Sequence, residues 1–393
     1  MSNLDKTPRR IVASDIAVLR EKLGVTAVDM DWIRGTKKRT FRLTGTGDQL
    51  SQVIVSPVDS MIYRYLDRFS EDYPLPAMPD VRDLLARTKA AWPEQRIPWR
   101  QGYFSLIIGC QDLTVRTWVS GTCNVSLPVS RLMYLLDQCL KLTNSTTNGL
   151  ELYLALVERE AISRGFGSLY ALLDQGNWGS SENSEHNPER LKESIIDVVK
   201  ELCGLSSIDA LWLMGYHQAP TKKHNQNKVI ADPTTALFYR VLHSYPNLDF
   251  VPVMPTIGDP MVPDSSSVIG ALLSSGIDDA LKRLSGEGIK TPKGINGRKF
   301  GLLLGCSFMM GYSWTHPSYR TENMSNTTLR LAYLLVNAIK KRGVQGFLDY
   351  YEVLQDEVLS RGRDMDEFWN MGWPEWRGVK SVETLAPASE STA

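Results

Sequence analysis

Apolar residues recur every three or four positions along several stretches of the chain. This spacing is found at residues 131–142, 150–164, 329–341 and 347–361. Because residues three and four positions apart share one face of an α-helix, each stretch predicts a helix with one buried face. Shorter apolar runs at 104–108 and 300–304 fit a strand or a buried helical turn equally well by periodicity, and their helical surroundings favour helix. We therefore expect a mainly α fold.

Sequence patterns in the first half of the chain recur in the second half. Residues 104–110 read FSLIIGC and residues 300–306 read FGLLLGC, and a tryptophan, Trp118 or Trp314, follows each run. Further matches join 23–35 to 203–215, 131–136 to 330–335 and 163–165 to 360–362. We interpret the chain as a tandem duplication of a helical module, with copies at about 11–178 and 190–376.

A smaller unit recurs inside each copy. It consists of an apolar helix ending in glycine, a short turn, a second helix carrying tryptophan, and a further apolar helix after a polar loop. Each copy is expected to hold two such helix-turn-helix-like units. The expected organisation is four units at residues 1–95, 96–180, 190–275 and 276–378, a polar linker at 181–189 and a flexible tail at 379–393.

The clearest unit lies at residues 103–136. Gly109 occupies the turn, and the small side chain of Ser105 is expected where the two helices cross most closely. The side chains expected to point into the core are Phe104 and Ile108 of the first helix and Val115 and Trp118 of the second.

This unit resembles the cro/C1-type, lambda-repressor-like helix-turn-helix regulators. In that family a stretch similar to L-G-V-S-x-x-T-V-x-x-W-x-x-G precedes a helix with leucines at helical spacing. The matching positions are Gly109, Val115, Trp118, Gly121 and residues 132–136. The other units match less closely, since Trp32 comes one position early and Gly311 replaces a branched apolar residue. The resemblance implies a DNA-binding transcriptional regulator, and a more general similarity points to regulators of conjugative plasmids or integrative elements.

The charge balance is even, with 44 Lys and Arg residues against 44 Asp and Glu residues, which argues against polybasic binding of nucleic acid. Two segments, 1–42 and 216–230, are nevertheless basic, and the first includes a loop that directly follows a candidate recognition helix. We expect these segments to contact phosphates, a solvated loop unrelated to DNA being the alternative. The candidate residues are Arg34, Lys37, Lys38, Arg39, Arg42, Lys222, Lys223 and Lys228.

Base readout needs exposed polar side chains early on the second helix of a unit. The candidates are Gln111, Asp112, Thr114, Arg116 and Thr117. Gln and Arg are the residue types that pair bidentately with adenine and guanine edges. In the second copy, Phe308 and Met309 suit an apolar contact or the core instead, so we expect the first copy to carry most of the sequence recognition.

Signatures of enzymes are missing: the sequence contains no GxxxxGK[ST], GxGxxG, HExxH or GxSxG motif. We expect no enzymatic activity, no cofactor and no metal site. Five cysteines without a CxxC pair fit reduced, packed thiols, and Asp29 and Asp209 fit favourable positions near helix starts. The apolar runs are too short to cross a membrane, and the N-terminus lacks the apolar stretch of a signal peptide, so we expect a cytoplasmic protein.

Two functions follow as hypotheses. The first is a sequence-specific regulator that binds double-stranded DNA and reads a two-part site through its tandem units. The second is a helical-repeat scaffold that binds protein partners in a mobile-element or phage assembly. Under either hypothesis, a further partner is another protein subunit or a second copy of the chain.

Overall fold

The computed structural model confirms the mainly α fold. It describes residues 8–35, 50–74, 78–94, 97–142, 145–179, 187–205, 209, 212, 227–246, 277–286, 288, 291, 295–315 and 324–374. Within these residues the regular elements are helices. Besides them there are two isolated antiparallel bridges, Val12 with Val53 and Lys192 with Val229. None of the described helices is both long enough and apolar enough to span a bilayer.

The helices form two compact units whose boundaries differ from the expected serial ones. Unit 1 combines Met1–Pro74 with Met254–Ala393, and unit 2 is Leu75–Val253. The segment expected as one module at 1–95 is therefore divided, and the segment at 190–275 is divided as well. Each compact unit contains residues from both proposed copies.

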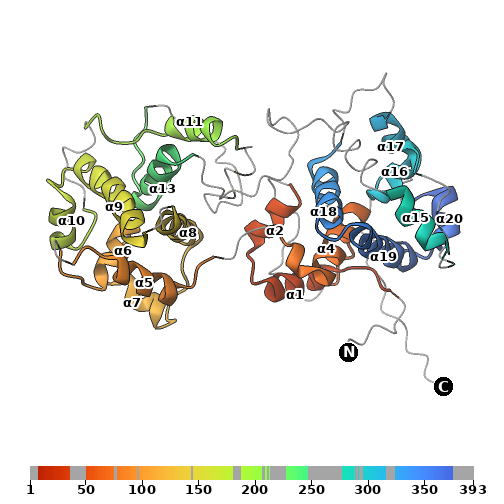
Figure 1. Ribbon diagram of the computed structural model, residues 1–393, viewed down its shortest axis with the longest axis horizontal. Helices are drawn as coiled ribbons and strands as arrows, with labels where there is room; N and C mark the ends of the chain where they lie inside the picture. Colours follow the sequence, from red (N-terminus) through yellow and green to blue (C-terminus); the bar gives the residue numbers. More distant parts are fainter. Residues whose placement is uncertain are drawn as a thin grey trace. The chain divides into compact units, whose positions relative to one another are not determined.

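Among the described residues, unit 1 has three α-helices and one short 3-10 helix from the start of the chain and six α-helices from its end; Figure 1 labels the α-helices. These are α1 (Ala13–Leu23), α2 (Ala27–Ile33), α4 (Pro57–Arg68), the short 3-10 helix η1 (Ser70–Asp72), α15 (Ile277–Gly286), α16 (Gly297–Leu303), α17 (Phe308–Thr315), α18 (Asn326–Arg342), α19 (Val344–Ser360) and α20 (Met365–Met371). Helices α4, α18 and α19 pack against one another, so the two ends of the chain share one core.

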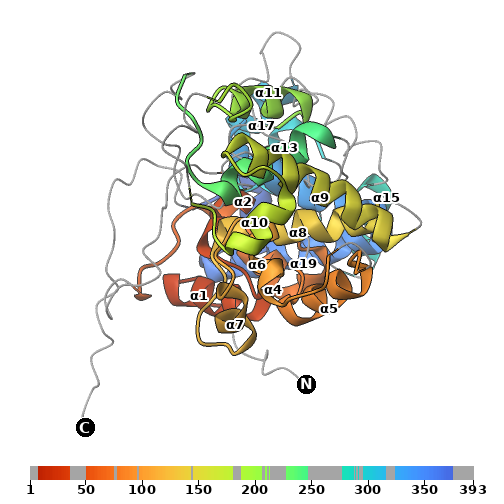
Figure 2. The same ribbon diagram turned by 90° about the vertical axis from the view of Figure 1, so that its left-hand side faces the viewer.

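Unit 2 is built from the middle of the chain. Its helices are α5 (Val81–Ala91), α6 (Gly102–Ile107), α7 (Thr114–Val119), α8 (Leu127–Lys141), α9 (Thr146–Ser163), α10 (Leu169–Gln175), α11 (Ile195–Leu202) and α13 (Pro233–Ser244). Helices α8, α9 and α13 pack together at the centre, as Figure 2 shows from the side of this unit. Leu132, Leu150 and Leu237 are fully buried there. Burying such side chains contributes about 2 kcal/mol each, so this cluster stabilises the unit.

Local sequence explains where α1 ends and α2 begins. Gly24 adopts a left-handed conformation with φ of 64°, which ends α1 without the steric cost that a side chain would bring. Thr26 then caps α2: its hydroxyl accepts from the Asp29 backbone N–H, and the Asp29 carboxylate accepts from the Thr26 backbone N–H at 2.7 Å. This reciprocal capping confirms that Asp29 supports a helix start.

A buried glutamate with two arginines occurs in each unit. In unit 2 the Glu160 carboxylate accepts from Arg164 Nε at 2.7 Å and from Arg240 Nε at 2.6 Å. In unit 1 Glu357 accepts from Arg361 Nε and Arg64 Nε, each at 2.6 Å. Both glutamates are completely buried, so losing either arginine partner would leave one buried carboxylate oxygen without its charged hydrogen-bond donor.

Further contacts are repeated between the units at positions that match in the two proposed copies. Tyr153 donates its hydroxyl to the Ile107 carbonyl at 2.9 Å, and Tyr350 donates to the Leu303 carbonyl at 2.7 Å. The guanidinium of Arg131 lies 4.1 Å from the ring centroid of Trp212, and that of Arg330 lies 4.7 Å from that of Trp32. In both cation-π pairs the arginine and the tryptophan come from different proposed copies. The duplication of the chain itself stays a prediction.

The composition of the units predicts how the chain responds to cleavage between the proposed copies. We expect a protease site inserted between residues 180 and 186 to yield two fragments that remain associated, because each unit contains residues from both. Size-exclusion chromatography before and after cleavage, in buffer and in urea, measures this. Fragments that elute separately in buffer would contradict the arrangement of the units.

Asp72 of unit 1 predicts a stability change with pH. Burial alone raises the pKa of its carboxyl, but hydrogen bonds from Tyr65, Lys341 and Arg342 outweigh burial and hold the pKa below its ordinary value. A carboxyl with a lower pKa in the folded chain stabilises it above the unfolded pKa of about 3.9, and that stability is lost as pH falls through the folded pKa. Asp72→Asn should therefore lower the free energy of unfolding at pH 7 by about 1–3 kcal/mol, with a smaller difference at pH 3.

The control for this experiment is Asp67→Asn. Asp67 pairs with Lys22 at 2.8 Å, and both side chains are exposed, so its removal should change stability by less than about 1 kcal/mol. Urea unfolding of both variants at the two pH values gives the comparison. If Asp72→Asn lowered the free energy of unfolding equally at pH 7 and pH 3, the ionised carboxylate of Asp72 would not be the stabilising group.

Candidate nucleic-acid interface

Helices α6 and α7 form a tight helix-turn-helix in unit 2. Gly109 lies in the turn with φ of 84°, a conformation that favours glycine. The hydroxyl of Ser105 accepts from the Val115 backbone N–H at 2.8 Å and donates to the Asp112 carbonyl at 3.2 Å. Ser105 is buried, so this side chain both permits close approach and fixes the start of α7 against α6.

The inward-facing positions agree with the sequence analysis except for one. Phe104, Ile108 and Val115 are fully buried as predicted. Trp118 is only half-buried, contrary to the expectation that it enters the core. Helix α7 is 6 residues long, and Trp118 lies on its last turn, where the helix reaches the edge of the core.

The back of the turn is covered by α13. Thr234 at the start of α13 donates its hydroxyl to the Ile108 carbonyl at 3.0 Å. A Cβ added to Gly109 would lie 2.5 Å from the Thr234 backbone nitrogen, so the contact also requires glycine for reasons of space. Because the turn is held from within the unit, the face of α7 that remains for a ligand is the outer one.

The five predicted base-reading residues lie together in the segment 111–117, with unequal exposure. Gln111 and Arg116 are exposed, and among the described residues neither side chain has a hydrogen-bond or ion-pair partner. Asp112, Thr114 and Thr117 are half-buried. Thr117 donates its hydroxyl to the Thr114 carbonyl at 2.8 Å within the helix. Gln111 and Arg116 are thus the two side chains of this set that are most available to bases.

One residue that supports α7 has no local signal in the sequence. Arg82 of α5 donates to the Val119 carbonyl from Nη2 at 2.7 Å and from Nε at 3.2 Å. A guanidinium at the carboxyl end of a helix satisfies a carbonyl that has no partner in the helix and interacts favourably with the helix dipole. Arg82 and Val119 are 37 residues apart in the sequence, so only the fold brings the guanidinium to the end of α7.

Arg34, predicted to contact phosphate, is buried instead. Its side chain is 4% exposed, and its Nε lies 2.8 Å from Asp59 Oδ1. The cause is the position of α2, which is buried along its whole length after the first residue, with Trp32 beneath Arg330. Helix α2 is therefore part of the core of unit 1, and the interpretation of it as an exposed recognition helix is wrong.

The remaining basic candidates give limited information. Lys228 is exposed, and its Nζ lies 3.1 Å from Glu193 Oε1, so a neighbouring carboxylate partly compensates its charge. The other predicted phosphate contacts lie outside the described residues; they are Lys37, Lys38, Arg39, Arg42, Lys222 and Lys223.

Helices α16 and α17 repeat the helix pair of α6 and α7 with a closer crossing. Gly301 and Gly311 take the places of Ser105 and Val115, and a Cβ on Gly311 would lie 2.3 Å from the Gly301 nitrogen. Gly311, where the family that the sequence resembles has a branched apolar residue, thus packs against a second glycine, Gly301, in the opposing helix. The outer face of α17 is largely apolar, since Met309 is 67% and Tyr312 36% exposed.

The cysteines of the two turns fit packing rather than nucleophilic chemistry. Burial raises the pKa of the Cys110 thiol and of the Cys306 thiol to about 11 in each case, so both stay protonated at neutral pH. Cys306 Sγ also lies 3.5 Å from the Thr328 hydroxyl. In the part of the chain that the structure describes, no cluster of His, Cys, Asp and Glu is arranged to hold a metal ion.

Comparisons of the chain with protein-family models, curated proteins and solved structures found no match. The candidate interface therefore depends on the geometry of α6 and α7 and on the exposed side chains of α7.

The close crossing of α16 and α17 predicts a large effect from a single methyl group. Gly311→Ala should lower the free energy of unfolding by about 1–3 kcal/mol, because the added Cβ forces the two helices apart. Gly286→Ala is the matched control, since a Cβ at Gly286 meets nothing within 4 Å. Urea unfolding measures both variants, and equal stability of the two would contradict the crossing described here.

Proposed function

We propose that the chain is a sequence-specific DNA-binding transcriptional regulator and that α7 is its reading helix. The observation that carries this proposal is the pair Gln111 and Arg116, exposed on a helix-turn-helix whose own core and turn are fixed from within unit 2. Side chains of these types recognise adenine and guanine edges in the major groove. A rigid support matters because base readout requires donors and acceptors at fixed positions.

The two proposed copies would contribute unequally to recognition. Helix α17 presents Met309 and Tyr312 where α7 presents polar side chains, and Arg298 lies 5.8 Å from the Tyr312 ring centroid. These side chains suit apolar contacts better than hydrogen bonds to bases. We therefore propose that α7 reads one half of a two-part site, while the second half makes contacts of lower sequence specificity.

The alternative function is a scaffold that binds protein partners, and the exposed apolar face of α17 favours it. Large exposed apolar side chains that lie close together are typical of protein-protein contacts. The two functions differ in one measurable property: a scaffold shows no preference among DNA sequences. The cytoplasmic location and the association with mobile elements remain expectations from the sequence.

The variant Arg116→Ala tests the reading role. With a DNA site selected by the wild-type chain, this variant should lose about 1–3 kcal/mol of binding free energy and discriminate less between bases at one position. Fluorescence anisotropy with the selected site and with random DNA, at fixed salt, gives both values. Binding to random DNA should change little, because phosphate contacts dominate there.

The matched control is Arg159→Ala. Arg159 is an exposed arginine of α9 in the same unit, and its Nε lies 3.4 Å from Glu189 Oε2. This variant removes the same charge from unit 2 and should leave discrimination between bases intact. Equal losses on selected and random DNA for Arg116→Ala would remove the reading role, and a failure to select any preferred site would favour the scaffold.

A further inference from the structure

Besides Gln111 and Arg116, the outer face of the α7 segment presents one large apolar side chain. Leu113 directly precedes α7, is 59% exposed and has helical dihedral angles, with φ of −76° and ψ of −12°. Its carbonyl accepts from the Arg116 backbone N–H at 3.1 Å, so the two residues lie one turn apart on the same face of the helix. The exposed surface of α7 therefore combines polar side chains with an apolar contact point.

The backbone on both sides of Leu113 is held in place by unit 2. The Ser105 hydroxyl donates to the Asp112 carbonyl and accepts from the Val115 backbone N–H. The Asp112 backbone N–H also donates to the Gly176 carbonyl at 3.4 Å. Leu113 is thus presented at a fixed position, although it has no place in the core, and a ligand that meets it need not order the backbone.

An exposed apolar side chain recurs at the same position of the α16–α17 pair. Leu113 follows the turn glycine Gly109 by four positions, and Met309 follows the turn glycine Gly305 by four positions. Met309 is 67% exposed. Apolar side chains that are exposed singly need no explanation, but two at one position of a repeated helix pair indicate a common use.

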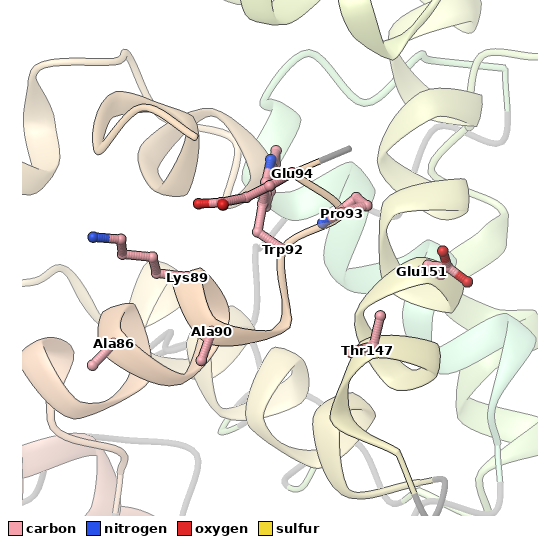
Figure 3. Close-up of a pocket in the computed structure, with 8 residues that line it drawn as sticks. All are labelled: Ala86, Lys89, Ala90, Trp92, Pro93, Glu94, Thr147 and Glu151. Atoms are coloured by element: carbon pink, nitrogen blue, oxygen red, sulfur yellow. The ribbon is translucent and has the colours of Figure 1, made fainter. Parts of the chain in front are cut away.

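Two pockets of unit 2 lie elsewhere, and Leu113 lines neither of them. One, of about 820 Å³, lies between the end of α5 and the first turns of α9 (Figure 3), and the other, of about 400 Å³, lies between α9 and the start of α10. Their walls come from these helices and from the segment after α5. Leu113 is instead presented on the surface of a helix, so a ligand that encloses it has to supply the groove.

DNA supplies such a groove, and one of its bases carries an apolar group there. In the major groove a thymine presents its C5 methyl, against which apolar side chains pack. Three residues of a helix rise by about 4.5 Å, and neighbouring base pairs are about 3.4 Å apart. A thymine that meets Leu113 therefore lies within about two base pairs of the base pair that Arg116 reads.

We propose that Leu113 is a specificity-determining residue that packs against the C5 methyl of a thymine, beside the base pair that Arg116 reads. The proposal rests on the proposed function and deepens it by naming a base of the recognised site. In α17 the matching positions hold Met309 and Tyr312, so the combination of an apolar contact and an arginine belongs to α7 and not to α17.

The test uses the full-length chain and the DNA site that it selects. Each thymine of that site is replaced in turn by deoxyuridine, which lacks only the C5 methyl. Fluorescence anisotropy at fixed salt should show binding about threefold to fivefold weaker for one replacement, the loss expected for one buried methyl group. That thymine should lie within about two base pairs of the position at which Arg116→Ala loses discrimination. The wild-type chain suffices for this measurement, so it does not depend on the folding of a variant at Leu113.

The variant Leu113→Ala should bind the unmodified site at least about threefold more weakly and should bind thymine and deoxyuridine equally at that position. Leu142→Ala is the matched control, because it shortens a leucine of the same unit that is 43% exposed and lies outside α7. It should keep both the affinity and the preference for thymine. Met309→Ala should keep the preference at this thymine as well, since Met309 belongs to unit 1. Circular dichroism melting verifies that each variant is folded.

Two outcomes would overturn the proposal while α7 keeps its reading role. In one, no replacement of thymine by deoxyuridine near the Arg116 position changes the affinity of the wild-type chain. In the other, Leu113→Ala keeps the wild-type preference for thymine. Arg116→Ala still loses discrimination in both. Failure of the chain to select any preferred site would instead remove the proposed function together with this contact and would leave the exposed leucine to a protein partner, so the two failures are distinguishable.

Discussion

The fold depends on two completely buried glutamates, each held between two arginines. A carboxylate in a core is stable only when charge and hydrogen bonds surround it, and here the partners come from segments far apart in the chain. Glu357 is held by Arg361 on its own helix and by Arg64 of α4, and Arg361 also donates to the Val55 carbonyl at 2.9 Å. The network therefore joins the beginning of the chain to its end. Glu160 does the same for two neighbouring regions of unit 2 through Arg240.

This requirement has a consequence for how the units are assembled. With only the arginine that follows its own helix, each buried Glu would have one carboxylate oxygen without its arginine donor, so the late helices of one proposed copy need α4 or α13 of the other. The cation-π contacts follow the same rule, because Arg330 covers Trp32 and Arg131 covers Trp212. Neither proposed copy holds a complete set of these partners by itself. Each compact unit thus contains both arginine partners of its own buried glutamate.

Sequence reasoning predicted the features that local rules determine. Helical periodicity, the turn at Gly109 and the burial of Val115 depend on residues within one helix-turn-helix, and all three are found. The burial of Arg34 was missed because its partner Asp59 lies in another helix, and a count of charges does not separate a paired core arginine from one that meets phosphate. The division of the expected module at 1–95 between the two units was missed for the same reason. Arg64 and Glu357 lie 293 residues apart, and no local sequence pattern shows that they pair.

The contrast between α7 and α17 shows how one scaffold can carry two kinds of surface. Both helices are held from behind by the start of another helix, through Thr234 at Gly109 and Val58 at Gly305. Their outer faces have no part in that support, so they can differ without loss of the fold. At the α6–α7 crossing a serine bonds to the backbone of α7, whereas the α16–α17 crossing uses two glycines and bare backbone. The polar side chains of α7 and the exposed Met309 of α17 therefore differ although each helix is held in a helix pair of the same kind, and under the proposed function α7 is the better place to look for base recognition.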